Sequence, residues 1–261
     1  MEFQDIIYQK KDGVATITIN RPHVYNAFRN QTIQEMVQAL EDADEDGTAG
    51  VVVIRGAGDK AFCTGGDVQA LLGKAGGENM RAFGKKFGRI GTIIREMAKP
   101  VIAAVDGWCI GGGNELNCWC DLTLATDRSR FGQRGAMVGG CPVYLTQLLP
   151  RLVGDKKAKE IIFLCQDYSA EEAMKMGLVN QVVPAARFEE ELEKLCQRLL
   201  DMSPTSIRIA KEAVNFGQAL QDSHMALAGD LLGYYFGSPE QQEGPRAFRE
   251  KRKPDFRQFR K

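Results

Sequence analysis

Two short apolar runs, each preceded by a helical pattern, constrain the fold of this chain more than any other feature of its sequence. The runs cover residues 51–54 and 101–105, and both lie next to Gly or Pro and are too short for a helix. Continuous apolar runs of this length are typical of strands that are buried on both faces of a sheet. We therefore predict that helices and strands alternate over the first half of the chain.

The helices in this alternation are indicated by the spacing of apolar residues. Residues 30–44 and 80–97 both repeat apolar side chains at intervals of three and four, which places them on one face of an amphipathic helix. The first set is Ile33, Met36, Val37 and Leu40, and the second is Met80, Phe83, Phe87, Ile90, Ile94 and Met97. Asp46-Gly47 and Pro100 are the expected ends of these two helices.

Three further elements complete the first half of the chain. Residues 3–8 and 14–19 are β-rich and are joined by a Lys-Asp-Gly turn, which predicts a hairpin. Residues 111–120 indicate a helix, and residues 122–125 indicate another strand.

The second half of the chain has a different pattern. From about residue 144 onward the sequence reads as almost wholly helical, with a capping box that begins at Ser169 and a helix start at Ser203-Pro204. Residues 186–235 are predicted to form three successive helices. Near the end of this region, a helical stretch with Leu227, Ala228, Leu231, Leu232, Tyr235 and Phe236 is apolar enough to pack across subunits, although apolar residues on a helix more often belong to the core of one chain. The chain is thus α/β first and helical last.

Composition excludes several classes of protein. The chain has 34 Lys and Arg against 34 Asp and Glu, so nothing favours general attraction to nucleic acid or to an acidic membrane. It contains no stretch of 18 apolar residues and no signal-peptide pattern, so we expect a soluble, cytoplasmic protein. The seven cysteines are odd in number and lack metal-ligand spacing, which favours reduced and mostly buried thiols.

Two glycine-rich segments, residues 61–67 and 108–115, are the main candidates for chemistry. Each follows an apolar strand and ends with glycines where a helical stretch begins, so backbone N–H groups can point at an anion or a carbonyl oxygen. For either segment alone, tight turns and close helix packing explain the glycines better. Together the two segments could build one oxyanion hole.

At this point the sequence resembles the crotonase (enoyl-CoA hydratase/isomerase) superfamily, and the resemblance covers nearly the whole chain. The motifs that carry it are Asn-Arg-Pro at 20–22, Asn-Ala at 26–27, Ala-Phe-Cys-Thr-Gly-Gly-Asp at 61–67, Lys-Pro-Val-Ile-Ala at 99–103, Gly-Gly-Gly-Asn-Glu at 111–115, Asp-Leu at 121–122, Phe-Gly-Gln at 131–133 and Gly-Leu-Val-Asn at 177–180.

The resemblance implies a fold and a substrate class. The fold would be a crotonase-like spiral of β-β-α repeats over residues 1–200, followed at 201–261 by a C-terminal helical trimerisation region with a basic tail. The substrate would be an acyl-CoA thioester, whose carbonyl oxygen accepts hydrogen bonds from the N–H groups of Gly66 and Gly112. The protein would assemble as a homotrimer or a dimer of trimers, and would use no cofactor beyond the coenzyme A of its substrate.

The acid/base residues depart from the pattern of the hydratases in this superfamily. Those members carry two glutamates, of which the first is matched by Glu115 and the second falls on Gly135. The Phe-Gly-Gln-Arg-Gly motif at 131–135 instead resembles the branch with dihydroxynaphthoyl-CoA synthase and 2-oxocyclohexanecarboxyl-CoA hydrolase. However, the aspartate of the synthase is missing at residues 139–142, and its C-terminal tyrosine falls near Phe236.

The motifs supply the remaining candidate residues. Glu115 lies among apolar neighbours and is the expected acid/base, with a raised pKa, while Asp67 is either a helix cap or a second polar group at the substrate. Residues expected to bind substrate are Ala61, Cys63, Thr64, Gly135, Cys141 and Tyr144, although core packing is the better interpretation for the last two. Residues expected to bind coenzyme A are Arg21, Asn26, Phe256 and Arg257. Arg134 could bind an anion, but a solvated arginine is the simpler reading. The two histidines, His23 and His224, are far apart in the sequence, so neither a metal site nor a Ser-His pair is expected.

Several functions remain open on this sequence. Hydration of an α,β-unsaturated acyl-CoA comes first, ring-opening hydrolysis of a cyclic β-oxoacyl-CoA second, and double-bond isomerisation third. A non-catalytic protein that binds coenzyme A, or RNA through its tail, is the alternative from another class. The tail at 245–261 carries eight Lys or Arg against two acidic residues. Its simplest interpretation is a solvated extension, and a rim for a polyphosphate ligand is the functional one.

Overall fold

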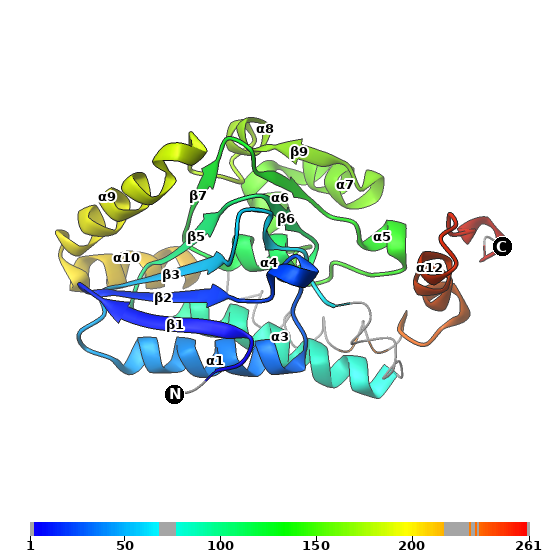
Figure 1. Cartoon of the computed structure of the whole chain (residues 1–261), viewed down its shortest axis with the longest axis horizontal. Coiled ribbons are helices and arrows are strands. Elements are labelled where there is room, and N and C mark those ends of the chain that lie inside the picture. The colour runs from blue at the N-terminus through cyan, green and yellow to red at the C-terminus, as the bar shows by residue number, and fades with distance from the viewer. Residues whose placement is uncertain (1–2, 68–76, 217–229, 231–232, 234, 260–261) are drawn as a thin grey trace.

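A computed structural model describes residues 3–67, 77–216, 230, 233 and 235–259. Its centre is a six-stranded sheet in the order β1-β2-β3-β5-β7-β10, in which β1 is antiparallel to β2 and the other neighbours are parallel. The strands are β1 (Ile6–Lys11), β2 (Val14–Ile19), β3 (Val51–Gly56), β5 (Val101–Val105), β7 (Leu122–Thr126) and β10 (Gln181–Val183). Figure 1 shows these strands between two layers of helices.

The N-terminal hairpin is confirmed. Asp12 and Gly13 at its tip have φ angles of 50° and 82°, which is the left-handed pair that a two-residue type I′ turn requires. Gly tolerates this conformation without cost, and Asp tolerates it better than most residues.

A second, four-stranded sheet follows the order β4-β6-β8-β9. Its strands are β4 (Ala61–Cys63), β6 (Trp108–Ile110), β8 (Arg130–Gly132) and β9 (Asp167–Ser169). In three successive strand pairs, β3-β4, β5-β6 and β7-β8, the first strand joins the large sheet and the second joins the small one. This arrangement confirms the predicted α/β fold built from β-β-α repeats.

The helices cover both faces of the large sheet. Helices α1 (Asn30–Glu45) and α3 (Gly77–Glu96) lie on one face, and α9 (Phe188–Leu200) lies on the other. Strand β3 explains why both layers are needed, because Val52 and Ile54 belong to one apolar cluster and Val51 and Val53 to the other. The continuous apolar run was therefore correctly interpreted as a strand buried on both faces.

The remaining helices are mostly short. They are α4 (Gly112–Trp119), α5 (Gly135–Val138), α6 (Leu149–Val153), α7 (Asp155–Leu164), α8 (Ala170–Lys175), α10 (Pro204–Phe216) and α12 (Pro239–Arg249), with single 3-10 turns at η1 (Pro22–Val24), η2 (Ala185–Arg187) and η3 (Phe256–Phe259). Ser169 and Glu172 form the predicted capping box at the start of α8.

The prediction of an almost wholly helical second half was wrong in detail, because β9 and β10 lie within it. Strands of three residues, including β4, β6 and β8, are too short to show a period in the sequence. Most of the third helix predicted within 186–235, including Leu227, Ala228, Leu231 and Leu232, lies outside the described residues, as does His224. The division at residue 200 stays a prediction.

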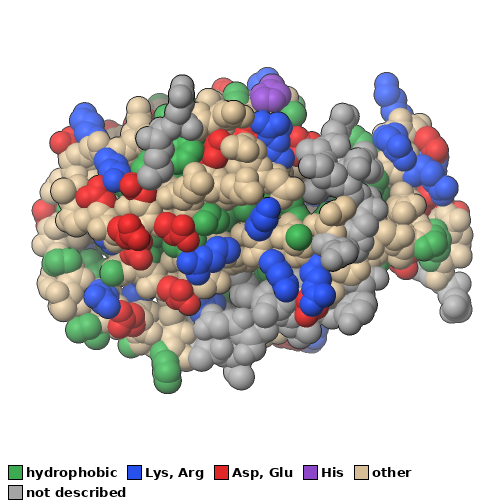
Figure 2. Space-filling model, turned by 90° about the horizontal axis from the view of Figure 1, so that it is seen from below, with side chains coloured by type: hydrophobic (Ala, Val, Ile, Leu, Met, Phe, Trp, Pro, Cys, Tyr) green, Lys and Arg blue, Asp and Glu red, His purple; other side chains and the backbone are tan. Residues whose placement is uncertain are grey.

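The outer surface of the α1 and α3 layer is charged and mixed in sign. Figure 2 views the molecule from this side and shows Lys and Arg interspersed with Asp and Glu over the described residues. This agrees with two amphipathic helices whose apolar faces point at the sheet. Among the described helices, none is both long and apolar enough to cross a bilayer.

Candidate active site

One cavity of about 300 Å³ opens where α3, the start of α4, α5 and α12 meet. Its wall is largely apolar and includes the aromatic side chains of Phe28, Phe83, Phe87, Tyr144, Phe236 and Phe248. The polar groups at this cavity are few, and they come from the two glycine-rich segments, which include Glu115, from residues 133–135, and from Cys141, Tyr144 and Gln241. A largely apolar cavity with a few convergent polar groups is the usual form of a small-molecule site.

The two glycine-rich segments touch each other at this cavity. A Cβ added to Gly65 would lie 2.8 Å from the Gly112 backbone nitrogen, and one added to Gly112 would lie 3.3 Å from Gly65 Cα. Gly113 packs equally closely on β4, since a Cβ there would lie 2.0 Å from the Cys63 carbonyl oxygen. The glycines thus permit close packing, and that packing also brings the two segments to one place.

The N–H groups of Gly66 and Gly112 lie beside the cavity and have no acceptor within the described part of the chain. Phe28 N donates to Gly65 O and Asp67 N donates to Phe28 O, so the parallel bridge at Gly66 turns its own N–H away from Phe28. Gly112 is the first residue of α4, where an N–H has no partner within the helix. Neither N–H is used by a hydrogen bond within the described part of the chain, and both glycines line the cavity. Two such donors can stabilise an oxygen that becomes negative during a reaction.

Glu115 lies in the first turn of α4 and also lines the cavity. It is only 7% exposed, and its Oε1 is buried without a hydrogen-bond partner. Removal from water penalises the charged form and raises the pKa of Glu115 to about 8. The carboxyl is therefore mostly protonated at neutral pH in the free protein.

This pKa makes stability depend on pH in a defined direction. Below the ordinary pKa of 4.5 the carboxyl is protonated in both the folded and the unfolded chain, so it adds no pH dependence there. Between that value and about 8 the unfolded chain releases the proton and the folded chain keeps it. The fold therefore loses about 1.4 kcal/mol for each pH unit over this window.

We expect Glu115→Gln to raise Tm relative to the wild type at about pH 8 and to change it much less at about pH 5. Glutamine does not titrate. The variant therefore loses the free-energy cost of keeping the Glu115 proton in the folded chain above pH 4.5, and with it this contribution to the pH dependence of stability. Thermal unfolding at both pH values checks this. A Tm difference that does not vary with pH would contradict a buried carboxyl with a raised pKa.

No second carboxyl lines the cavity among the described residues. Gly135, where the second glutamate of the hydratases is expected, begins the four-residue helix α5. A Cβ there would lie 3.1 Å from Gly140 O and 3.3 Å from Pro142 Cδ. The turn at 139–142 therefore packs where a side chain at position 135 would begin.

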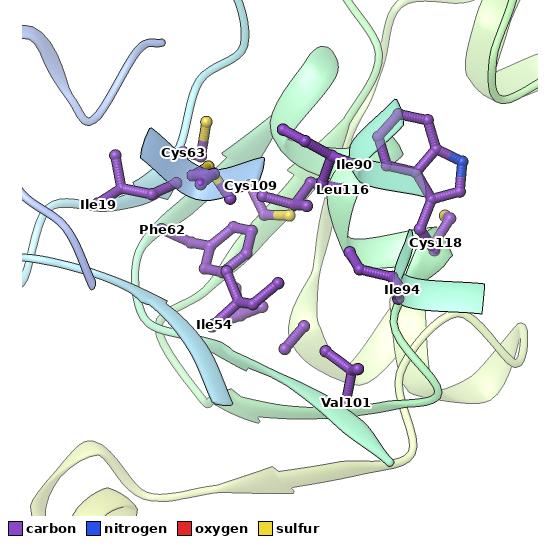
Figure 3. Packing of buried hydrophobic residues seen from close by; sticks show 14 of the residues in the cluster. Ile19, Ile54, Phe62, Cys63, Ile90, Ile94, Val101, Cys109, Leu116 and Cys118 are labelled. Carbon is purple, nitrogen blue, oxygen red and sulfur yellow. The ribbon is translucent and has the colours of Figure 1, made fainter. Parts of the chain in front are cut away.

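The structure brings some of the predicted substrate-binding residues to the cavity and leaves others in the core. Thr64, Gly135, Cys141 and Tyr144 line it. Ala61 and Cys63 lie in β4 and are fully buried. Figure 3 shows the Cys63 side chain within the apolar cluster, near Phe62 and Cys109, so only the backbone of this strand can serve the site. The seven cysteines are free, and Cys141 is the exposed one.

Asp67, Arg21 and Asn26 form a structural network beside the site. Arg21 Nη2 donates to Asp67 Oδ2 at 3.0 Å; the Arg21 side chain is buried and that of Asp67 is mostly buried. Asn26 is fully buried, accepts from Arg21 N, and donates to Ala57 O and Ala61 O. Although their predicted roles at the substrate and at coenzyme A are untested, these contacts favour holding the loops in place.

The C-terminal tail is held by ion pairs within the chain. The Glu243 carboxylate is buried, accepts from Asp255 N, and pairs with Arg246 and Arg252. Phe256 and Arg257 lie beyond it in η3 and do not line the cavity, so their assignment to coenzyme A stays a prediction.

Arg134 is partly exposed, in keeping with the solvated arginine that the sequence suggested, and it also has partners in the protein. Its guanidinium pairs with Asp167 and lies 5.2 Å from the centre of the Trp108 ring.

Sequence reasoning missed part of the site. It did not single out Gln133, which is 1% exposed, lines the cavity, and has no hydrogen-bond partner at either side-chain atom. It also placed Phe83 and Phe87 on the apolar face of a helix without indicating that this face borders a cavity. The Phe-Gly-Gln motif was the available signal for Gln133.

The α/β spiral of β-β-α repeats, with an apolar cavity beside two glycine-rich segments, is typical of one class of enzymes, and comparison with known proteins gives the same family. A family model described as enoyl-CoA hydratase/isomerase matches residues 9–260. The chain therefore belongs to that family, within the crotonase superfamily, and is an acyl-CoA-processing enzyme.

Solved structures resemble it over nearly the whole chain. An enoyl-CoA hydratase from Mycobacterium avium subsp. paratuberculosis K-10 is 28% identical with a TM-score of 0.88, covering 98% of this chain and 99% of that one. An enoyl-CoA hydratase/isomerase from Xanthobacter autotrophicus Py2 is 34% identical with a TM-score of 0.85, covering 95% and 94%. An enoyl-CoA hydratase from Bacillus anthracis is 31% identical with a TM-score of 0.78, covering 97% and 99%.

Proposed function

We propose that the protein adds water to an α,β-unsaturated acyl-CoA, with Glu115 as the acid/base. The observation that carries this proposal is the buried Glu115 carboxyl, with an unpartnered oxygen and a raised pKa, in the same cavity as two backbone N–H groups that have no acceptor among the described residues. Solved structures similar to the chain include proteins described as enoyl-CoA hydratases.

The proposed reaction needs one carboxyl, used twice. Ionised Glu115 takes a proton from water as the water oxygen bonds to the β-carbon and the double-bond electrons move toward the thioester. The N–H groups of Gly66 and Gly112 stabilise the resulting enolate oxygen. Protonated Glu115 then returns the proton to the α-carbon, which gives the 3-hydroxyacyl-CoA and restores the carboxylate. No cofactor or metal takes part.

Ring-opening hydrolysis of a cyclic β-oxoacyl-CoA is the second candidate. Gly135 and the Phe-Gly-Gln-Arg-Gly motif favour it, because they resemble the branch that contains such a hydrolase. The same backbone donors would stabilise the enolate released when the ring bond breaks. Isomerisation is third, since one carboxyl is sufficient to move a proton between two carbons.

A homotrimer or dimer of trimers and a cytoplasmic location are further proposals. Exposed apolar side chains on α10, among them Ile209, Val214 and Phe216, support assembly with other subunits.

Two substrates separate the functions. We expect purified protein to convert crotonyl-CoA to a product heavier by one water, seen by mass spectrometry, and to leave 2-oxocyclohexanecarboxyl-CoA unchanged. Consumption of the cyclic thioester alone would instead identify a ring-opening hydrolase. Isomerisation leaves the mass unchanged, so a gain of one water excludes it as the observed reaction. Incubations without protein give the background for both thioesters.

A further inference from the structure

The Tyr144 ring is held firmly in the cavity wall. Its centre lies 5.7 Å from that of Phe87 and 5.9 Å from that of Trp119, both edge to face. It also packs on α3 at Gly88, where an added Cβ would lie 3.1 Å from Tyr144 Cε1. With 3% of the residue exposed, the ring has little room to move.

The Tyr144 hydroxyl, in contrast, has no hydrogen-bond partner in the described structure, although it is buried and the residue lines the cavity. A buried hydroxyl without a partner is costly, and a ligand is one group that can supply the missing partner. Burial, the Glu115 charge and the Asp230 charge raise the pKa of Tyr144, so the phenol keeps its proton at neutral pH. It can therefore donate a hydrogen bond but cannot act as a base.

Tyr144 and Glu115 face the same space. Each lines the cavity, each has a buried oxygen without a partner, and they are near enough for the charge of one to shift the pKa of the other. Gly135 adds no side chain to this space. A donor and an ionisable acceptor that face one small volume can bind a single oxygen atom between them.

We propose that Tyr144 and Glu115 form a binding site for one oxygen atom, to which the Tyr144 hydroxyl donates a hydrogen bond and from which the Glu115 carboxylate accepts one. This proposal rests on the hydration proposed above. The bound oxygen is that of the water before addition and that of the 3-hydroxyl group of the product afterwards. The proton that leaves the water goes to Glu115, and Tyr144 keeps its own. Tyr144 is thus a positioning residue in a cavity where Glu115 is the one carboxyl among the described lining residues.

Binding of two ligands tests the site without relying on a turnover rate. The hydroxylated ligand is the product of the proposed hydration, so it is first brought to equilibrium with crotonyl-CoA and the affinity measured is that of the equilibrated ligand. Titration calorimetry with 3-hydroxybutanoyl-CoA and with butanoyl-CoA compares an acyl chain that carries the oxygen with one that lacks it. We expect Tyr144→Phe to weaken binding of the hydroxylated ligand about 3- to 10-fold, as for loss of one neutral hydrogen bond, and to leave butanoyl-CoA unchanged. In turnover of crotonyl-CoA the same variant should lose a similar factor in kcat with little change in KM.

Tyr168→Phe is the matched control. Tyr168 is also buried, but its hydroxyl donates to Glu160 at 2.8 Å and the residue does not line the cavity. This variant should leave both affinities as in the wild type.

Equal weakening of both ligands by Tyr144→Phe would indicate a packing role and would overturn the oxygen site. Unchanged affinity for both, or no measurable binding of 3-hydroxybutanoyl-CoA to the wild type, would also overturn it. If the wild type fails to hydrate crotonyl-CoA, the proposed function is wrong. The oxygen site is still tested in that case, by whether Tyr144→Phe weakens binding of 3-hydroxybutanoyl-CoA more than binding of butanoyl-CoA.

Discussion

Replacing Glu115 by Gln is expected to lower kcat for hydration of crotonyl-CoA by about 10²- to 10⁴-fold, with the affinity for butanoyl-CoA within about threefold of the wild type. The amide has nearly the shape of the carboxyl, so the cavity keeps its form. It can neither take the proton of water nor return one to the α-carbon. Steady-state kinetics and titration calorimetry on the same preparation measure both quantities.

Glu35→Gln is the control for removing a buried carboxylate. Glu35 is 3% exposed and lies outside the cavity, where its oxygens accept from the backbone nitrogens of Gln4, Asp5 and Ile6. Loss of the Glu35 charge should lower Tm and leave kcat unchanged. Glu115→Gln should instead raise Tm at about pH 8 and lower kcat. Full activity in the Glu115 variant would mean that another group moves the proton, and would remove the basis of the proposed reaction.

The parts of this site that depend on the backbone could be predicted from the sequence. A strand followed by glycines and a helix predicts free N–H groups at the helix start, and both Gly66 and Gly112 line the cavity. Glu115 could be found because it lies within the first turn of that same helix, among apolar neighbours. Burial and the raised pKa follow from this position.

The parts that could not be predicted depend on where side chains point. Arg21, Asn26 and Asp67 stand in motifs of the family, but a motif does not say whether a side chain faces a ligand or another loop. Here Arg21 pairs with Asp67, and Asn26 connects two loops. In the same way, periodicity identified Phe83 and Phe87 as an apolar face without distinguishing a core from a cavity wall.

The β-β-α spiral was only partly predictable for a related reason. The first strand of each repeat is a five- or six-residue run in the large sheet, and its apolar pattern is strong. The second strand has three residues, and its position depends on pairing with the second strand of the next repeat, as β4 pairs with β6. Such long-range pairing leaves no local pattern in the sequence.

The backbone donors lead to a second large effect. Replacing Gly112 by Pro is expected to lower kcat/KM for crotonyl-CoA about 10²- to 10³-fold below that of Gly112→Ala. Gly112 is the first residue of α4, a position where proline is well accepted, and its N–H has no partner in the described protein, so the helix loses no bond of its own.

Gly112→Ala makes this comparison specific to the N–H group. In both variants the new Cβ would lie 2.5 Å from Phe28 Cζ, so both must displace the end of the same ring. Alanine keeps the N–H, whereas proline replaces its hydrogen with a carbon. If kcat/KM is much lower for Gly112→Pro than for Gly112→Ala, a substrate oxygen must bind at this N–H. That holds whether activity is lost because the donor is missing or because the added carbon occupies the place of the oxygen. Equal kcat/KM values for the two variants, with comparable Tm, would mean that no reacting oxygen binds at Gly112, and the enolate would then need another source of stabilisation.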